Sequence, residues 1–150
     1  MKAIALDTNL LALYVVGSAT GRAMGKRLKG YTDDDIPVLL DCIARDDRVI
    51  TTPNVWTEFF NIWDWGIDDP LRSEVLQASI AMAKQSIELV RPSRDVVDDP
   101  ELDRLGLSDC VWLAVLDQHT TLLTDDIALY NIALSRGLTA VNFTHLRQLD

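Results

Sequence analysis

Short apolar segments alternate with segments of helical character along this chain, and this alternation constrains the fold more than any other feature. Each apolar segment is bounded by polar or turn-forming residues, which favours a strand over a buried helix. Five segments of this kind are expected as strands: residues 2–6, 48–51, 87–90, 121–123 and 138–141. Because parallel strands are joined by crossover helices, the alternation predicts an α/β fold with a central, mainly parallel sheet of about five strands.

Helices are expected between these strands, and local signals mark where several of them begin or end. They are residues 8–16, a segment that begins near 33, 53–65, 71–85, 109–118, 126–136 and a short C-terminal helix. Gly17 is expected to end the first helix, and Thr52 and Ser108 are expected to cap the helices that follow them. Thr32 with Asp35 forms a capping-box pattern with Asp in place of Glu. The length of 150 residues suits one domain, residues 1–150, with a substantial core.

The charge balance is strongly acidic and limits how the chain could bind nucleic acid. Fourteen basic and 23 acidic side chains give a formal net charge of −9. This balance argues against a protein that holds nucleic acid by bulk positive charge. It leaves room for nucleic acid if the acidic residues gather around a metal ion and the basic residues gather elsewhere.

Cysteine usage and hydropathy indicate a cytoplasmic protein with no membrane contact. Cys42 and Cys110 have no metal-ligand spacing and fit buried free thiols in a reducing compartment. Asp7 interrupts the N-terminal apolar run, which is then too short for the core of a signal peptide. No stretch approaches the roughly 20 apolar residues of a membrane span.

Aspartates stand at the ends of expected strands and at the starts of helices. Asp7 follows the first strand, Asp125 and Asp126 follow the fourth, and Asp109 opens an apolar helix. In α/β folds, ligands gather at the carboxyl ends of strands and at neighbouring helix N-termini. Each aspartate taken alone also has an ordinary interpretation as a helix cap, so both readings stay open.

Glu58 is harder to explain as a surface residue. It lies three residues after Val55 and four before Ile62, on the apolar face of its helix. A carboxylate on that face needs a partner charge, a hydrogen-bond network or a metal ion, and no Lys or Arg lies within a helical turn of it. The alternative is a glutamate that bends to solvent at the rim of the core.

A cluster of carboxylates at one edge of a sheet would repel itself without cations. Ligand sets that contain only oxygen suit Mg²⁺ or Mn²⁺. Two such ions about 4 Å apart activate a water and stabilise the leaving oxygen of a phosphodiester. The sequence contains no glycine-rich phosphate loop that would compete for this chemistry.

Four segments together resemble the PIN-domain family of metal-dependent nucleases, which includes the VapC-type toxins of toxin–antitoxin pairs. They are residues 6–9 (LDTN), 52–59 (TPNVWTEF), 107–109 (LSD) and 122–126 (LLTDD). Each segment alone is a weak signal, whereas four in order on alternating α/β elements are fairly specific. The matched segments are spread over almost the entire chain.

The resemblance implies a three-layer α/β/α sandwich and an endoribonuclease that uses Mg²⁺ or Mn²⁺ and a metal-activated water. It assigns Asp7, Glu58, Asp109 and Asp126 as the catalytic, metal-holding acids, with Asp125 as the alternative fourth ligand. The positions that would support the acids or the water are Thr8, Asn9 and Thr124. The expected partners are an RNA substrate, an antitoxin protein and a second copy of the chain.

Basic and aromatic residues offer candidate contacts for RNA. Four basic residues fall within eight positions and are candidates for phosphate contact: Arg22, Lys26, Arg27 and Lys29. A solvated surface segment explains them equally well. Trp112 is expected in the core, Trp56 and Trp63 in the core or a dimer interface, and Trp65 is the candidate for stacking on RNA or a partner.

Three other functions are consistent with parts of this pattern. One is a PIN-like binding or assembly module without turnover, although a retired site has no reason to retain Glu58. The second is a nuclease of the same type that acts on DNA. The third is a small-molecule phosphatase, but Asn9 stands where the DxDx[TV] motif of such enzymes requires an aspartate.

Overall fold

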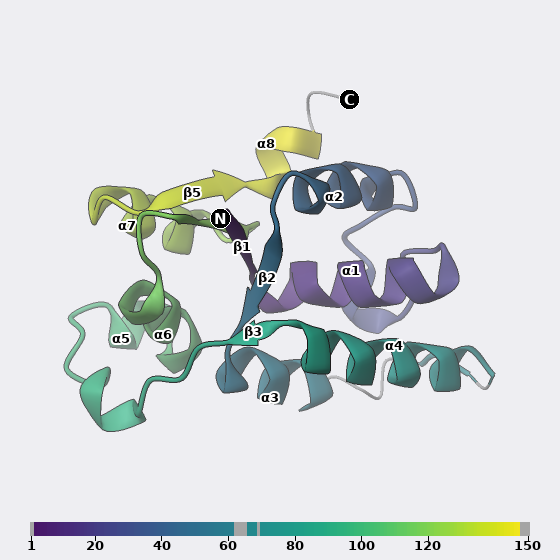
Figure 1. The fold of residues 1–150 in the computed structure, drawn as a ribbon, viewed down its shortest axis with the longest axis horizontal. Coiled ribbons are helices and arrows are strands. Elements are labelled where there is room, and N and C mark those ends of the chain that lie inside the picture. The colour runs from purple at the N-terminus through teal and green to yellow at the C-terminus, as the bar shows by residue number, and fades with distance from the viewer. Residues whose placement is uncertain (1, 62–65, 69, 148–150) are drawn as a thin grey trace.

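The computed structural model describes residues 2–61, 66–68 and 70–147, which form an α/β fold around one sheet (Figure 1). The strands are β1 (Ala3–Leu6), β2 (Arg48–Thr51), β3 (Ile87–Glu88), β4 (Thr120–Thr124) and β5 (Thr139–Asn142). Their order across the sheet is β3-β2-β1-β4-β5, and every neighbouring pair is parallel. The predicted five-stranded parallel sheet is therefore confirmed.

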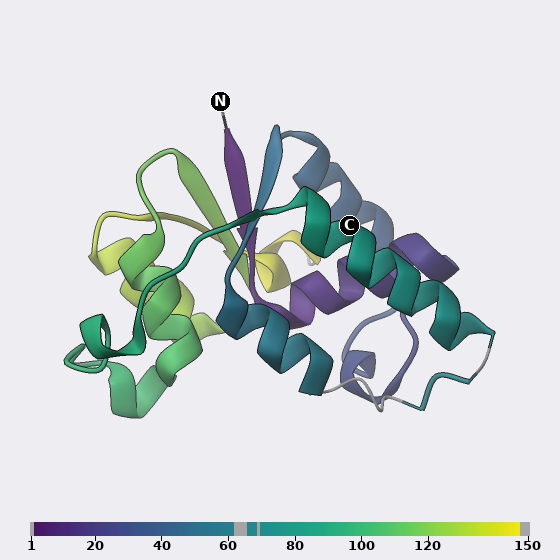
Figure 2. The same cartoon turned by 60° about the horizontal axis from the view of Figure 1, so that its bottom comes forward.

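Helices cover both faces of the sheet, which makes three layers. Figure 2 shows α1 to α4 on one side of the strands and α5 to α7 on the other. The α-helices are α1 (Thr8–Thr20), α2 (Asp35–Ala44), α3 (Pro53–Asn61), α4 (Leu71–Gln85), α5 (Leu102–Leu105), α6 (Leu107–Val115), α7 (Ile127–Ser135) and α8 (Phe143–Arg147). Two short 3₁₀ helices are η1 (Lys26–Leu28) and η2 (Ser93–Asp95). None of the described helices is long and apolar enough to pass through a bilayer.

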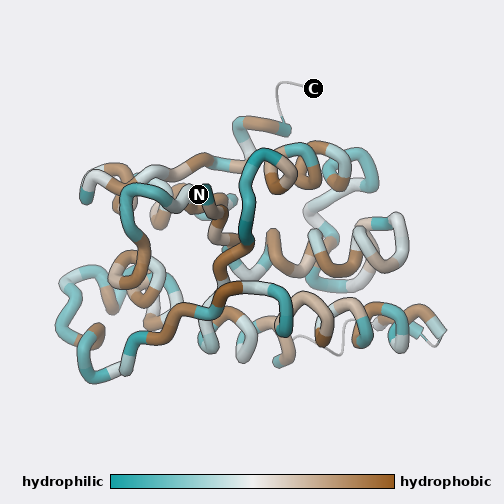
Figure 3. The backbone as a smooth tube through the Cα atoms, in the orientation of Figure 1, coloured by the Kyte–Doolittle hydropathy of each residue, from teal (hydrophilic) through white to brown (hydrophobic). Residues whose placement is uncertain are grey.

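The core is built on β1 and α1, which lie at the centre of the molecule. Ile4, Ala5 and Leu6 are buried because a parallel sheet is covered on both faces. α1 packs against α2, α3 and α4 and buries residues around most of its circumference. In Figure 3, apolar residues occur along the strands and at intervals along the helices, and many turns are hydrophilic.

Gly17 does not end the first helix as expected. α1 continues to Thr20 and ends at Gly21, whose φ of 73° is left-handed and whose N–H donates to the Gly17 carbonyl at 2.8 Å. Gly17 instead allows close packing, because a Cβ there would lie 3.0 Å from Cγ1 of Ile36 on α2. Position 17 does favour glycine, but the reason is the close packing of α1 against α2 and not the end of a helix.

The start of α6 also differs from expectation. α6 begins at Leu107 with Gly106 before it, so Ser108 lies inside the first turn and is not its cap. The expected end of the third helix at residue 65 lies outside the described residues. At the start of that helix, Thr52 caps as predicted, because its Oγ1 accepts a hydrogen bond from the Val55 N–H at 3.1 Å.

Candidate active site

A pocket of about 480 Å³ lies at the carboxyl edge of the sheet, where β1 and β4 end. It brings together every acidic residue that the sequence analysis gave as a candidate metal ligand. These residues are Asp7, Glu58, Asp109, Asp125 and Asp126. They come from four separate segments, and the parallel arrangement of strands puts those segments at one edge of the sheet.

Asp7 is both a helix cap and a pocket residue. Its Oδ1 accepts the Thr8 N–H at 2.8 Å, and its Oδ2 accepts the Thr124 hydroxyl at 2.9 Å. Burial nevertheless raises the pKa of Asp7 to about 6, and the nearby charges of Asp125 and Glu58 act in the same direction. The interpretations of Asp7 as a helix cap and as a residue of a ligand site are therefore compatible.

Glu58 is partly buried on α3 and lines the pocket. Its Oε2 accepts a hydrogen bond of 2.7 Å from the hydroxyl of Thr8 at the start of α1. Thr8 is itself only 3% exposed, so this contact is sheltered from water. A carboxylate on the apolar face of a helix needs a partner, and for Glu58 that partner is the Thr8 hydroxyl.

Asp109 lies in the first turn of α6 and faces the most unfavourable electrostatic environment in the site. The pKa of Asp109 is raised to about 8, mainly by burial and also by the charges of Asp7, Asp126 and Glu58. Within the described part of the chain, no donor forms a hydrogen bond to its carboxylate. Its ionised form therefore has little stabilisation from the protein.

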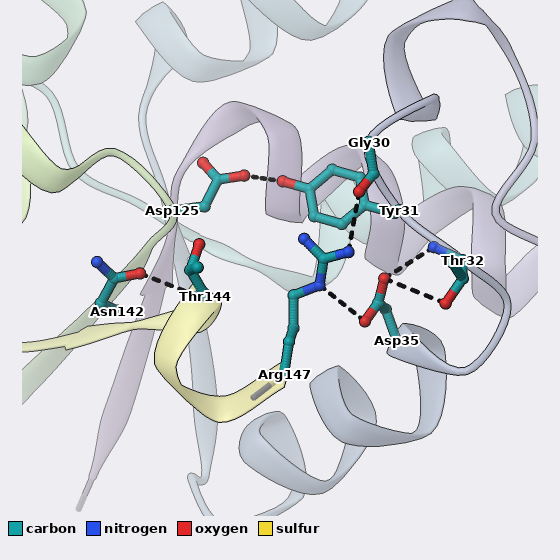
Figure 4. Close-up of polar contacts among 8 residues, drawn as sticks. All are labelled: Gly30, Tyr31, Thr32, Asp35, Asp125, Asn142, Thr144 and Arg147. Atoms are coloured by element: carbon teal, nitrogen blue, oxygen red, sulfur yellow. Dashed lines mark hydrogen bonds and ion pairs between the residues drawn. The ribbon is translucent and has the colours of Figure 1, made fainter. Parts of the chain in front are cut away.

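Asp125 and Asp126 both line the pocket but are held in different ways. Asp126 caps α7, and its Oδ1 accepts the N–H groups of Ala128 at 2.8 Å and Leu129 at 3.2 Å. Asp125 Oδ2 accepts the hydroxyl of Tyr31, and burial raises the pKa of Asp125 (Figure 4). Each carboxylate keeps one oxygen outside these hydrogen bonds, so either could supply the fourth ligand.

Tyr31 belongs to a network that the sequence did not reveal (Figure 4). The Arg147 guanidinium lies 5.2 Å from the centre of the Tyr31 ring and donates from Nε to Asp35 Oδ1 at 2.9 Å. Asp35 Oδ2 in turn accepts the Thr32 N–H at 2.7 Å, which is one bond of the predicted capping box, but α2 begins at Asp35 and not near residue 33, so Thr32 is not its cap. The C-terminal helix α8 is thereby connected to the residue that holds Asp125. No local pattern could indicate Tyr31, because its contact with Asp125 spans 94 residues.

Among the four candidate phosphate contacts, Arg27 lines the acidic pocket. Its Nε donates to Asn9 Oδ1 at 2.8 Å, so Asn9 positions this cation and its amide oxygen does not contact an acid. Arg22, Lys26 and Lys29 are exposed and do not line this pocket. The described structure therefore separates one member of the basic segment from the other three.

The aromatic and cysteine predictions have mixed outcomes. Trp112 is fully buried and Trp56 is 7% exposed, as expected for core residues. Trp63 and Trp65, including the stacking candidate, lie outside the described residues. Both cysteines are free; Cys110 is buried, but Cys42 is only partly buried, which corrects that half of the expectation.

The donor set fits a hard divalent cation. The acids supply only oxygen atoms, and Arg27 is the cationic side chain that the described pocket contains. Within the described residues, no three His, Cys, Asp or Glu side chains already converge as ligands of one ion. Such convergence is not required for Mg²⁺, which usually binds one or two carboxylates, keeps several waters and takes further oxygens from substrate phosphates.

Comparison with known proteins leaves the function to be inferred from the site. No protein-family model matches the chain, and no curated protein matches it. Among solved structures, the chain is similar to a domain of a functionally unknown protein from Methanocaldococcus jannaschii DSM 2661. That similarity has 17% sequence identity and a TM-score of 0.48, and it covers 95% of this chain and 91% of the other. The fold assignment rests on the sheet topology described above.

Proposed function

We propose that this chain is a metal-dependent endoribonuclease of the PIN-like type, which hydrolyses RNA phosphodiester bonds with water as the nucleophile. The observation that carries the proposal is the meeting of five carboxylates and one arginine in a single pocket. Burial and, to a lesser extent, neighbouring carboxylates raise the pKa values of Asp7 and Asp109, so their ionised forms are unfavourable without a cation. A divalent cation supplies the missing charge.

The residues that would hold Mg²⁺ or Mn²⁺ are Asp7, Glu58, Asp109 and Asp126, with Asp125 as the alternative to Asp126. When bound, the cation lowers the pKa of the attacking water and offsets charge on the phosphodiester. The water oxygen forms the new bond to phosphorus as the bond to the leaving ribose oxygen breaks. The proton lost by the water is accepted by a pocket carboxylate, and the leaving oxygen takes up a proton from a solvent water.

Threonine side chains would keep the acids oriented during this reaction. Thr124 holds one oxygen of Asp7, and the backbone N–H of Thr8 holds the other. The hydroxyl of Thr8 holds Glu58, so one residue orients acids from two elements. Preorganised carboxylates need no rearrangement when the cation and substrate arrive.

Arg27 would bind the phosphate of the substrate. Its Nε is occupied by Asn9, which leaves the two Nη groups for phosphate oxygens. The chain as a whole carries a net charge of −9, so we expect weak RNA binding that depends on metal and on salt. An antitoxin and a second copy of the chain stay predictions from the family resemblance.

The proposal is tested by cleavage of a defined pool of single-stranded RNAs. The protein is incubated with Mn²⁺, with Mg²⁺ and with EDTA, and DNA of matched sequence is run in parallel. We expect RNA cleavage with either metal, none with EDTA, and none with the Asp7→Asn variant. Asp41→Asn, an exposed change on α2, serves as the matched control and retains activity. Metal-dependent cleavage that survives in Asp7→Asn would contradict the assignment, and cleavage of DNA alone would transfer it to DNA.

A further inference from the structure

A second pocket of about 340 Å³ adjoins the acidic pocket and lies between the first turns of α3 and α6. Its described lining is Pro53, Asn54, Thr57, Glu58, Leu107 and Ser108. Glu58, Leu107 and Ser108 line both pockets. A substrate that occupies the acidic pocket therefore reaches the second pocket without leaving the protein surface.

The second pocket combines apolar walls with unused hydrogen-bonding groups. Pro53 and Leu107 supply apolar surface. The Thr57 hydroxyl already donates a hydrogen bond of 2.9 Å to the Pro53 carbonyl. Within the described part of the chain, the half-buried Asn54 side-chain amide forms no hydrogen bond, whereas Ser108 Oγ is unpaired but closed off from solvent. A buried polar group without a partner is unfavourable, so a ligand that pairs with it gains affinity.

These features suit a nucleobase better than a second phosphate. A base is flat and apolar on its faces and carries donors and acceptors along its edge. A phosphate would meet the carboxylate of Glu58 here, whereas Arg27 lines the acidic pocket and is not in the described lining of this one. The start of α3 also has few free donors for a phosphate, because Pro53 has no N–H and the Val55 N–H is bound by Thr52 Oγ1 at 3.1 Å.

We propose that the pocket between α3 and α6 is a base-binding subsite that holds one nucleobase next to the scissile phosphate. Asn54 would contact the edge of that base and so determine which base is preferred at one flanking position. The inference rests on the proposed nuclease function, because it takes the acidic pocket as the place of the phosphate.

Binding of nucleotides without metal tests the subsite separately from cleavage. The isotope-labelled protein in EDTA is titrated with AMP, GMP, CMP and UMP while side-chain amide resonances are followed by NMR. The Asn54 amide is identified by its absence from Asn54→Ala. We expect its resonance to shift by different amounts with the four bases, while that of Asn61, an exposed residue of the same helix, does not move. An unmoved Asn54 resonance, or equal shifts with ribose 5-phosphate, would overturn the subsite.

Cleavage specificity supplies the second readout. RNAs with each base on either side of the scissile bond are cut by wild type, Asn54→Ala and the control Asn61→Ala. We expect a base preference at one flanking position that falls about tenfold in Asn54→Ala only. Active cleavage whose preference ignores Asn54→Ala would overturn the subsite and leave the nuclease assignment standing. Absent cleavage together with base-dependent shifts at Asn54 would support the subsite and reject the nuclease.

Discussion

The hydroxyl of Thr8 donates a 2.7 Å hydrogen bond to Glu58 Oε2, which joins the start of α1 to the middle of α3 across 50 residues. The same residue's backbone N–H binds Asp7, so Thr8 lies between two of the candidate metal ligands. Because Thr8 is 3% exposed, the hydroxyl has little access to water as an alternative partner. The positions of Asp7 and Glu58 therefore both depend on one neutral residue.

Replacement of Thr8 by valine should reveal the contribution of its hydroxyl, because valine has nearly the same shape and lacks that group. Thr8→Val keeps the N–H bond to Asp7 and removes the hydroxyl donor to Glu58. We expect a loss of about 1–2 kcal/mol in the free energy of unfolding, together with weaker Mn²⁺ binding. Urea denaturation and calorimetric titration measure the two effects. Thr8→Ser should restore both, and a Thr8→Val protein with wild-type stability and metal affinity would contradict the role.

The stability of the metal-free protein should fall as pH rises from about 4 to about 8. The pKa of Asp109 is raised from 3.8 to about 8 by burial and that of Asp7 to about 6. A raised pKa in the folded state means that the stabilising contribution is complete below the unfolded-state value and is lost as pH passes through the folded-state value. Unfolding in EDTA at pH 5 and pH 8.5 measures the loss. Asp109→Asn should flatten this dependence and raise stability at pH 8.5 by on the order of 2 kcal/mol.

Divalent metal should offset the loss of stability of the metal-free protein at higher pH. Protons and Mn²⁺ compete for the same carboxylates, so we expect Mn²⁺ to raise the melting temperature more at pH 8 than at pH 6. The Asp7→Asn variant should lose most of the increase, whereas Asp41→Asn should keep it. Thermal scans with Mn²⁺ and with EDTA give the comparison. A pocket without metal affinity would yield identical scans.

Arg27 should influence substrate binding more than folding. Because its side chain is exposed, we expect Arg27→Ala to leave the melting temperature within about one degree. KM for RNA should rise about fivefold or more, and the salt dependence of log KM should weaken by about one in slope. Arg22→Ala, which removes an exposed arginine outside the pocket, is the matched control. Equal effects of the two variants would point to general charge instead of a specific contact.

The parallel sheet was predictable because each strand signal is local. A short apolar segment such as Ala3–Leu6 is buried on both faces, and that burial is visible in its composition. The acids were predictable for the same reason, since Asp7 directly follows one strand and Asp125 another. Gly17 misled because a glycine that permits close helix packing and a glycine that ends a helix look identical in sequence.

The sequence by itself determined the α/β architecture and singled out the five candidate acids, because each signal depends on neighbouring residues. Three acids follow strands, Asp109 opens a helix, and Glu58 lies on an apolar helix face. Only the tertiary structure decided that Arg27 lines the pocket and that Asn9 holds it, across 18 residues of intervening chain. It also decided that Tyr31 binds Asp125, through a contact between segments 94 residues apart. These contacts depend on how loops and helix ends pack against one another, and that packing leaves no periodic trace in the sequence.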